Sequence, residues 1–273
     1  MTADDPVSSA RPAPFDAAPL FALRDWAAAR ADGGTPPVSV VAPMYNEAGG
    51  AAALVREIYG RLGEAAEIVI VDDASVDATL AALQDVRADV PTVRIIRHHK
   101  NAGQSRALRT GVLAARAGVV VTLDGDGQND PADIPALVSQ LTRPDAPPEL
   151  AMVGGERRVR KDAAAKRWAS RAANAIRARA LNDGAADTGC GLKAFHREAF
   201  LRLPYFDHMH RYLPALMRRE GFAVEFRPVN HRARAHGASK YTNWGRLAVA
   251  FRDLLGVMWL NDRARKPIDI SEL

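Results

Sequence analysis

Three side chains that carry oxygen atoms stand at alternate positions in one short segment. Asp124, Asp126 and Gln128 follow the apolar run 119–123, with a glycine in each gap. Side chains at this spacing on a turn can converge on one hard divalent cation, which usually keeps waters that substrate phosphates then replace. The alternative is a turn whose carboxylates only cap backbone amides. The segment therefore indicates a metal site without establishing one.

A second acidic cluster follows another apolar run. Asp72 and Asp73 come directly after residues 68–71, and Ser75 and Asp77 stand a few positions further on. Asp or Ser at such a place often caps the next helix. Capping does not require two adjacent carboxylates, which repel each other unless a ligand with N–H or O–H donors binds there. A base or a ribose would be such a ligand.

Both clusters must be positioned by the elements that precede them. The pattern of apolar residues predicts strands at 38–42, 68–71, 93–98 and 119–123, and helices at 51–62, 79–89 and 105–117. Such an alternation is typical of an α/β fold with a mostly parallel, Rossmann-like sheet flanked by helices. Ligands of these folds bind at the carboxyl ends of the strands. We therefore expect both acidic clusters and residues 43–47 at one rim of the sheet.

Several classes of protein are excluded or disfavoured. There is no Gly-x-Gly-x-x-Gly after the first predicted strand and no Walker lysine loop, which argues against dinucleotide-dependent oxidoreductases and P-loop enzymes. The single cysteine, Cys190, excludes a disulfide framework and a multi-cysteine zinc site, and favours a cytoplasmic setting. No apolar run approaches the roughly 18–20 residues that span a bilayer, and the first residues lack the basic start of a signal peptide. Any membrane association is expected to be peripheral.

Charge is divided unevenly along the 273 residues. The net charge is +5, but residues 1–150 carry 13 basic and 20 acidic side chains, whereas residues 151–273 carry 24 and 12. An acidic half can hold a metal, and a basic half can hold an anion such as phosphate, nucleic acid or a lipid headgroup. The acidic rim would repel a nucleic acid, and no nucleic-acid motif is present, so no nucleic-acid partner is expected.

Basic residues cluster on a helix predicted at 163–181. Lys166 and Ser170 fall on one stripe of that helix, and Arg167 falls on the adjoining stripe. A cation and a hydroxyl at one place suit a phosphate monoester, because ionic attraction and hydrogen bonds act together. A solvated helix face is the alternative. The spacing does not decide whether Lys166 or Arg167 points inward.

Seven segments of the chain together resemble a known enzyme family. Four are similar to the nucleotide-sugar domain of family 2 inverting glycosyltransferases of the GT-A fold: residues 38–47, 71–79, 100–107 and 124–131. Three more are similar to the polyprenyl-phosphate branch of that family, which includes dolichol-phosphate mannosyltransferase: residues 153–162, 187–195 and 236–241. The resemblance is specific because the segments occur in the family's order.

The resemblance implies an inverting, metal-dependent transfer of a sugar from a UDP- or GDP-linked donor to a polyprenyl phosphate of the undecaprenyl or dolichyl type. Such a reaction serves cell-envelope glycans and takes place at the inner face of the cell membrane. Mg²⁺ or Mn²⁺ would neutralise the leaving nucleoside diphosphate. The acceptor phosphate is ionised near pH 7 and needs no general base. A soluble family 2 transferase acting on a saccharide or protein hydroxyl, which would need a carboxylate base, is the alternative.

The resemblance also assigns roles to individual residues. Nucleotide binding falls to Pro43, Tyr45, Glu47, Asp73, Gly103 and Asp124, and metal binding to Asp124, Asp126 and Gln128. Contacts to the acceptor phosphate fall to Lys166, Arg167, Ser170, Arg234, Ser239 and Lys240. The catalytic residues are Asp126, Arg157 and Asp187. An ordinary loop glycine is the alternative for Gly103, and a turn cap is the alternative for Asp187.

The chain is expected to contain one catalytic domain. Residues 1–36, rich in Ala, Pro and Asp, form a partly mobile appendage. Residues 37–242 form the GT-A domain, with a nucleotide and metal half at 37–135 and an acceptor half at 150–242.

An amphipathic segment follows the domain at residues 243–273. A helix predicted at 244–260 carries an apolar stripe that includes Trp244 and Trp259, with basic residues beyond it. The stripe fits a helix that lies in the membrane interface. Packing on its own domain, or on a second copy in a homo-oligomer, is the alternative.

Overall fold

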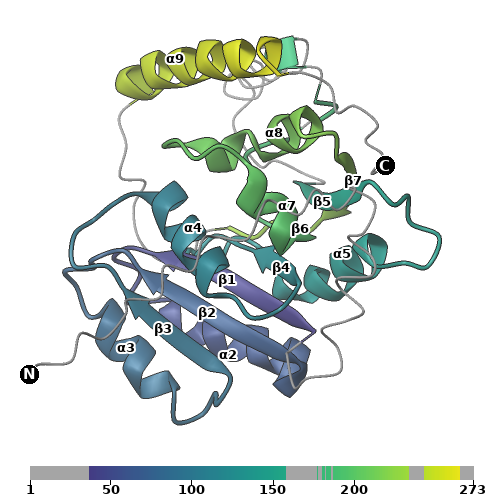
Figure 1. Ribbon diagram of the computed structural model, residues 1–273. Coiled ribbons are helices and arrows are strands. Elements are labelled where there is room, and N and C mark those ends of the chain that lie inside the picture. Colours follow the sequence, from purple (N-terminus) through teal and green to yellow (C-terminus); the bar gives the residue numbers. More distant parts are fainter. Residues whose placement is uncertain are drawn as a thin grey trace, which may run out of the picture.

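The computed structural model describes most of the chain between residues 37 and 264. The described residues are 37–157, 177, 180, 181, 183–185, 187–233 and 243–264, with the backbone alone at 243–248. Figure 1 shows a sheet with helices on both faces and a long helix, α9 (Asn243–Asp262), set apart from the sheet. The following predictions lie outside the described residues: the appendage 1–36, most of the helix 163–181, Lys166, Arg167, Ser170, Arg234, Ser239 and Lys240.

Four parallel strands form the first part of the sheet. They are β1 (Val38–Met44), β2 (Ala66–Asp72), β3 (Val93–Arg97) and β4 (Val119–Thr122). β1 lies between β2 and β4, and β3 pairs with β2. Every residue of β2 is buried. A parallel strand covered on both faces is a continuous apolar run, which is why β1, β2 and β4 were predictable, whereas the edge strand β3 was predicted from its β-branched residues.

Three strands that were not predicted complete the sheet. They are β5 (Leu150–Arg157), β6 (Lys193–His196) and β7 (Ala223–Val229). The strand order is β3-β2-β1-β4-β6-β5-β7. β6 runs antiparallel to both β4 and β5, whereas β7 is parallel to β5. The sheet is mixed but mostly parallel, so the α/β class expected from the sequence is confirmed.

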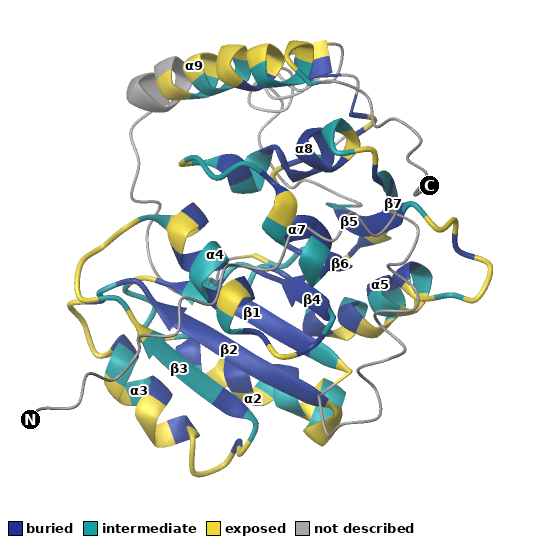
Figure 2. Ribbon diagram, viewed as in Figure 1, coloured by how far each residue is buried: buried dark blue, intermediate teal, exposed yellow. Residues whose placement is uncertain are grey.

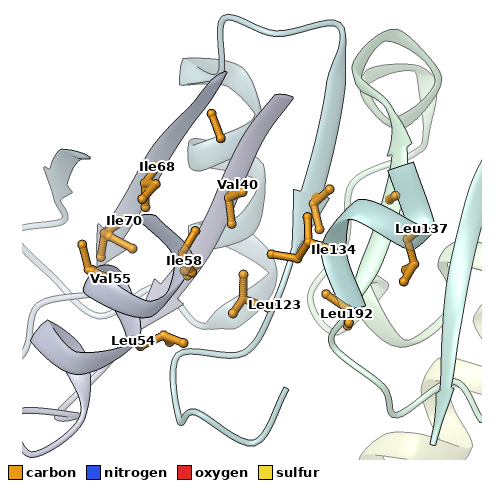
Figure 3. Packing of buried hydrophobic residues seen from close by; sticks show 14 of the residues in the cluster. Val40, Leu54, Val55, Ile58, Ile68, Ile70, Leu123, Ile134, Leu137 and Leu192 are labelled. Carbon is orange, nitrogen blue, oxygen red and sulfur yellow. The ribbon is translucent and has the colours of Figure 1, made fainter. Parts of the chain in front are cut away.

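Helices bury an apolar cluster on each face of the sheet. One cluster involves α2 (Ala51–Leu62), α3 (Thr79–Val86) and α5 (Ile134–Leu141), whose residues Ile58 and Ile134 point toward the strands in Figure 3. The other involves α4 (Gln104–Ala114), α7 (Arg197–Arg202) and α8 (Leu213–Arg219). Val40 and Val41 belong to opposite clusters, as alternation along a strand requires. Figure 2 shows the central strands buried between the two layers.

Three short turns of 3₁₀ helix link these elements: η3 (Gly63–Ala65), η4 (Pro131–Asp133) and η5 (Met209–Arg211). η4 follows residues 124–128, which carry the predicted metal ligands and are called the metal loop below. η5 comes just before α8. η4 therefore lies next to a segment that carries predicted site residues.

α9 packs on the helical layer and not on the sheet. Val257 is buried in the cluster that also contains residues of α8. The Tyr212 hydroxyl donates to the Ala250 carbonyl over 3.2 Å, and Arg219 Nε donates to the Leu260 carbonyl over 3.1 Å. Hydrogen bonds therefore fix α9 near its middle and near its C-terminal end. In the part of the chain that the structure describes, no helix is both long enough and apolar enough to cross a membrane.

Candidate active site

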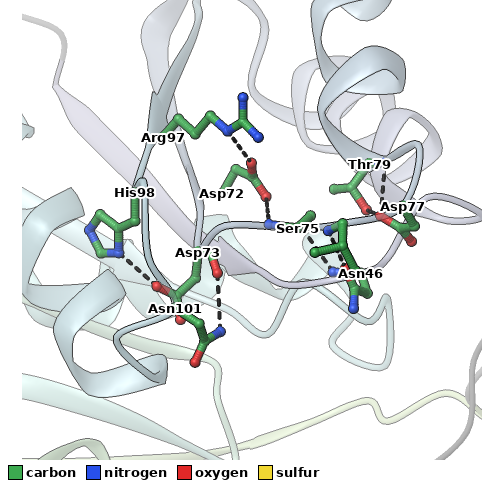
Figure 4. Close-up of polar contacts among 10 residues, drawn as sticks. Asn46, Asp72, Asp73, Ser75, Asp77, Thr79, Arg97, His98 and Asn101 are labelled. Carbon is green, nitrogen blue, oxygen red and sulfur yellow. Dashed lines mark hydrogen bonds and ion pairs between the residues drawn. The ribbon is translucent and has the colours of Figure 1, made fainter.

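The loops after β1 and β2 are bound to each other at the carboxyl ends of these strands (Figure 4). The Asn46 amide donates to the Ser75 hydroxyl over 2.9 Å, and the Asn46 side chain accepts from the Val76 amide over 2.8 Å. The Glu47 amide donates to the Thr79 hydroxyl over 2.8 Å. Two segments that are far apart in the sequence thus form one surface.

The loop after β4 lies against the loop after β1. A Cβ atom at Gly125 would come within 2.5 Å of the Pro43 carbonyl oxygen and 2.7 Å of the Met44 side chain, so only glycine fits there. Tyr45 is exposed, and Pro43 and Glu47 are partly buried. Pro43, predicted to bind the nucleoside, therefore lies beside the predicted metal loop at the end of β1.

Asp77 caps the start of α3. Its Oδ1 accepts from the Thr79 hydroxyl and from the Thr79 amide over 3.0 Å, and its Oδ2 accepts from the Ala48 amide over 3.3 Å. Burial alone would raise the pKa of Asp77, but these hydrogen bonds outweigh it and lower the pKa below 3.8. Asp72 is fully buried, and its Oδ2 lies 3.6 Å from Arg97 Nε. Asp77 thus has the capping role that its position in the sequence suggested.

Asp73 organises the loop that leads into α4. Its Oδ1 accepts from His98 Nδ1 over 2.7 Å and from the Ala102 amide over 2.9 Å, and its Oδ2 accepts from the Gly103 amide over 2.8 Å. The Asn101 side chain donates to the Asp73 carbonyl over 3.0 Å. Gly103 has a φ of 84°, which residues with a Cβ disfavour. Asp73 and Gly103 therefore form one unit with His98 and Asn101, two residues not singled out from the sequence.

Asp124 lies between α4 and the segment that leads into β6. Gln104 Nε2 donates to Asp124 Oδ1 over 2.8 Å, and the Asp124 amide donates to Asn129 Oδ1 over 2.9 Å. A Cβ atom at Gly191 would lie 2.4 Å from the Asp124 carboxyl carbon, so only glycine allows this approach. Burial, and then repulsion from Asp126, raises the pKa of Asp124 above 3.8. A cation beside the two carboxylates would relieve that repulsion.

Gln128 is held by the segment that follows β7. Its amide donates to Asp126 Oδ1 over 3.1 Å, and its carbonyl accepts from the Arg232 amide over 2.9 Å. Its side-chain Nε2 lies 3.4 Å from the Arg232 carbonyl oxygen and 3.4 Å from His231 Nε2. Because Nε2 can only donate, Oε1 is the atom of this side chain that could bind a cation.

Arg157 and Asp187 form a bidentate ion pair. Arg157 Nε donates to Asp187 Oδ2 over 2.5 Å, and Arg157 Nη2 donates to Asp187 Oδ1 over 2.7 Å. Their side chains are only 14% and 11% exposed. The hydrogen bonds to Asp187 raise the pKa of Arg157, which stays charged. Two predicted catalytic residues are thus partners, and Asp187 orients a cationic neighbour. The catalytic role of Asp187 remains a prediction.

Lys193 is a buried cation that was not singled out from the sequence. It begins β6, opposite Thr122 of β4, and its Nζ donates to the Cys190 carbonyl. Burial lowers the pKa of Lys193, and the carboxylates of Asp124 and Asp187 oppose that shift. Its charge therefore acts on both the metal loop and the ion pair. The only available signal was a lysine inside a short apolar run.

η5 contacts the first turn of α4, beside the metal loop. The Ser105 hydroxyl oxygen and His210 Nδ1 are 2.7 Å apart. Burial, with a further contribution from Arg211, lowers the pKa of His210 well below 6.5. His208 Nδ1 lies 3.0 Å from Asp253 Oδ2, on α9. Contacts thus connect α9, η5 and the start of α4.

The donor atoms at the metal loop fit Mg²⁺ or Mn²⁺. Among the described residues, no group of three or more His, Cys, Asp and Glu side chains could hold a metal ion. Asp124 and Asp126 offer two carboxylates and Gln128 offers an amide oxygen, which is a hard but incomplete set of ligands. Cations bound by so few protein ligands take the rest from water and substrate phosphates. The residues therefore suit a metal shared with a diphosphate.

Comparisons with known sequences agree with this arrangement. The profile described as Glycosyl transferase family 2 matches residues 39–203. The chain is 34% identical over 239 residues to the dodecaprenyl-phosphate galacturonate synthase of Rhizobium johnstonii. The alignment covers 84% of this chain and 69% of that protein. It is 36% identical over 228 residues to the undecaprenyl-phosphate 4-deoxy-4-formamido-L-arabinose transferase of Pseudomonas aeruginosa. That alignment covers 81% of this chain and 65% of that protein. The chain thus spans about two thirds of the length of these relatives.

Solved structures support the same fold. Glucosyl-3-phosphoglycerate synthase from Mycobacterium tuberculosis, in complex with Mn²⁺, UDP and glucosyl-3-phosphoglycerate, matches with a TM-score of 0.64 at 18% identity, over 92% of this chain and 85% of that chain. The same enzyme with Mg²⁺ and UDP gives a TM-score of 0.62 at 19% identity, over 88% and 83%. At this identity the likeness shows the GT-A fold alone. The family profile covers more than half of the sequence, and the two relatives are 34% and 36% identical to it over the aligned residues. This chain therefore belongs to glycosyltransferase family 2.

Proposed function

We propose that this chain transfers a sugar from a nucleoside-diphosphate sugar to a polyprenyl phosphate, with inversion at the anomeric carbon. The observation that carries the proposal is the pair Asp124 and Asp126, whose repulsion at a partly buried rim favours a bound cation. The partly buried Arg157 and the buried Lys193 act on the same place. The two sequence relatives are named for dodecaprenyl-phosphate and undecaprenyl-phosphate products, which supports a lipid phosphate as the acceptor.

The donor would bind across the rim formed by the three loops. Pro43, Tyr45 and Glu47 would contact the nucleoside, and Asp73 would act partly through the loop that it organises. Asp124, Asp126 and Gln128 would hold Mg²⁺ or Mn²⁺ at the diphosphate. When bound, the metal would supply positive charge to the leaving nucleoside diphosphate.

The chain's own residues would orient the acceptor phosphate, and the reaction would need no general base. An oxygen of the acceptor phosphate forms a bond to the anomeric carbon while the bond from that carbon to the donor diphosphate breaks. The phosphate is ionised near pH 7, so no proton has to be removed. Arg157, fixed by Asp187, would offset negative charge where the two anionic substrates meet. Further contacts to the acceptor phosphate are predicted at Lys166, Arg167, Ser170, Arg234, Ser239 and Lys240.

Product analysis tests this proposal. The chain would be incubated with Mg²⁺ or Mn²⁺, undecaprenyl phosphate and a panel of UDP- and GDP-linked sugars. We expect release of the nucleoside diphosphate together with a sugar that partitions into the organic phase. If free saccharides were glycosylated while no donor gave a lipid-linked product, the acceptor assignment would be wrong and a transferase acting on a hydroxyl would take its place.

We also propose that α9 attaches the chain to the inner face of the cell membrane. The stripe expected from the sequence is divided in the structure, since Leu254 and Val257 pack on the protein. Among the side chains of α9 that the structure describes, five apolar ones are exposed instead, with Phe251 and Trp259 at 62% and 63%: Val249, Phe251, Leu255, Met258 and Trp259. Arg252 and Arg263 are also exposed. A basic and aromatic outer face of this kind suits an anionic lipid surface.

Vesicle sedimentation tests the role of α9. We expect the wild-type chain to sediment with vesicles that contain phosphatidylglycerol, and the double variant Phe251→Ser, Trp259→Ser to stay in the supernatant with unchanged binding of nucleoside diphosphate. The wild-type chain could instead remain in the supernatant and form a dimer that the double variant does not form. That result would assign this face to contact with a second copy.

A further inference from the structure

The Arg232 side chain joins two elements beside the metal loop. Its Nη1 and Nη2 donate to the two carboxylate oxygens of Glu57, on α2, over 2.8 and 2.7 Å. Nη2 also donates to Asp130 Oδ1 over 2.6 Å. Asp130 in turn caps η4, because its Oδ1 accepts from the Ala132 amide over 2.9 Å. Residue 232 is thus fixed to α2 and to the end of the metal loop.

The backbone of Arg232 binds the metal loop directly. Its amide donates to the Gln128 carbonyl over 2.9 Å, and its carbonyl accepts from Gln128 Nε2 over 3.4 Å. The adjacent residues Asn129 and His231 form an antiparallel bridge. Asn129 Oδ1 accepts from the Asp124 amide over 2.9 Å. One short segment after β7 therefore fixes the loop at Gln128 and, through Asn129, at Asp124.

We propose that Arg232 is a positioning residue for the cation of the transfer reaction. Anchored by Glu57 and Asp130, it holds Gln128 so that the amide oxygen stays beside the two carboxylates of the metal loop. The inference rests on the proposed function. Groups that orient a metal ligand typically change metal affinity by about 10–100-fold when they are removed.

Charge and geometry both support this role. Glu57 and Asp130 compensate the guanidinium, so Arg232 does not place an unpaired positive charge beside a cation. An isolated surface ion pair contributes little, but this one is bidentate to one carboxylate and shared with a second. Its contacts link α2, η4 and the end of β7, and a small shift in any of them would move Gln128.

Titration with Mn²⁺ alone tests the proposal. Binding to the metal-free full chain would be followed through the electron paramagnetic resonance signal of free Mn²⁺, and the titration would be repeated with UDP or GDP. We expect Arg232→Ala to bind Mn²⁺ at least about 10-fold more weakly than the wild type. Arg232→Lys should recover part of the loss, because one ammonium can pair with a single carboxylate but cannot bridge both in the fork geometry.

Arg143→Ala is the matched control. Arg143 also forms a bidentate pair, with Glu225 over 2.9 and 2.7 Å, and donates to the Gln140 carbonyl over 2.6 Å. The exposed fractions of the two arginine side chains are similar, 28% for Arg143 and 38% for Arg232. Glu225 lies several residues before His231, about 20 Å along an extended strand. We expect the Mn²⁺ affinity of Arg143→Ala to stay within about twofold of the wild type.

The outcomes separate this inference from the proposed function. Wild-type Mn²⁺ affinity in Arg232→Ala would overturn the positioning role and leave the transferase proposal in place. An equal loss in Arg143→Ala would also overturn it, because the effect would then be general. A wild-type chain that binds no Mn²⁺, with or without either nucleotide, would overturn the metal-dependent function itself. If Arg232→Ala does not fold, Glu57→Ala, which removes the bidentate partner, decides the question by the same measurement.

Discussion

Two acidic loops share one rim of the sheet, and their charges are compensated in opposite ways. In the loop after β2, backbone amides and a hydroxyl donate to Asp73 and Asp77, and these hydrogen bonds lower the pKa of the exposed Asp77 although desolvation opposes them. In the loop after β4, burial and then the charge of Asp126 raise the pKa of Asp124. The same residue type is thus stabilised as an anion in one loop and destabilised in the other. The first loop is a completed scaffold, whereas the second gains from an added cation.

The substitution Asp126→Asn is the strongest test of the contrast between the two loops. It removes one charge from the metal loop and keeps the size of the side chain. We expect the transfer rate to fall at least about 10³-fold, or about 4 kcal/mol of transition-state stabilisation, because the diphosphate loses its bound cation. Steady-state kinetics would measure the loss, and thermal unfolding should show an intact fold.

Asp85→Asn provides the control, because Asp85 is an exposed aspartate on α3. It removes the same charge away from the rim and should leave the rate unchanged. Full activity in Asp126→Asn would mean that the loop after β4 needs no cation, and the contrast between the loops would disappear.

Asp73→Ala tests the other side of the comparison. It leaves the amides of Ala102 and Gly103 and the ring of His98 without their acceptor. These donors are at most partly buried, and a hydrogen bond of this kind contributes about 0.5–1.5 kcal/mol, so we expect the loss of three to lower the free energy of unfolding by about 2–4 kcal/mol. Urea denaturation measures this loss. A variant with wild-type stability that loses only nucleotide binding would show that this loop is a ligand site and not a scaffold.

Acidification should separate the two loops by a smaller effect. The raised pKa of Asp124 means that protons compete with the cation at a higher pH than for an ordinary aspartate, so Mn²⁺ affinity should fall by up to about tenfold per pH unit below that pKa. The pKa of Asp77 is lowered in the folded chain, so its stabilising contribution is present above 3.8 and is lost as the pH falls through the lowered value. Mn²⁺ titrations and urea denaturation across this range should show metal uptake failing first. Simultaneous loss would make the two loops equivalent.

The first four strands were predictable from the sequence, and the last three were not. β1, β2 and β4 are apolar runs whose residues are mostly buried, and β3, a partly buried edge strand, is still rich in Val and Ile. β6 has four residues, of which Lys193 and His196 are polar and yet buried. A strand of that composition cannot be told from a loop until its neighbours are known. β5 contains Gly154 and Gly155, which weaken the strand pattern.

Local spacing also decided which parts of the site could be predicted. The metal loop was found because its three oxygen-bearing side chains lie within five positions of one another. The pairing of Arg157 with Asp187 spans 30 positions, and that of Gln128 with Arg232 spans 104. Nothing in the spacing of residues so far apart indicates that they meet. The resemblance to a family named Arg157 and Asp187 as catalytic residues, but their contact required the fold.

The place of β6 in the sheet affects how the chain can be made in the cell. β6 pairs with β4, and the Thr122 hydroxyl donates to the Gly191 carbonyl across 69 positions. While the ribosome synthesises the chain, the edge of β4 stays open until residues 193–196 have emerged, and open strand edges pair with other chains. We therefore expect nascent chains to depend on chaperones until β6 is complete. A chain truncated before β6 would keep the edge of β4 open, so we expect it to aggregate and not to act as a slow enzyme.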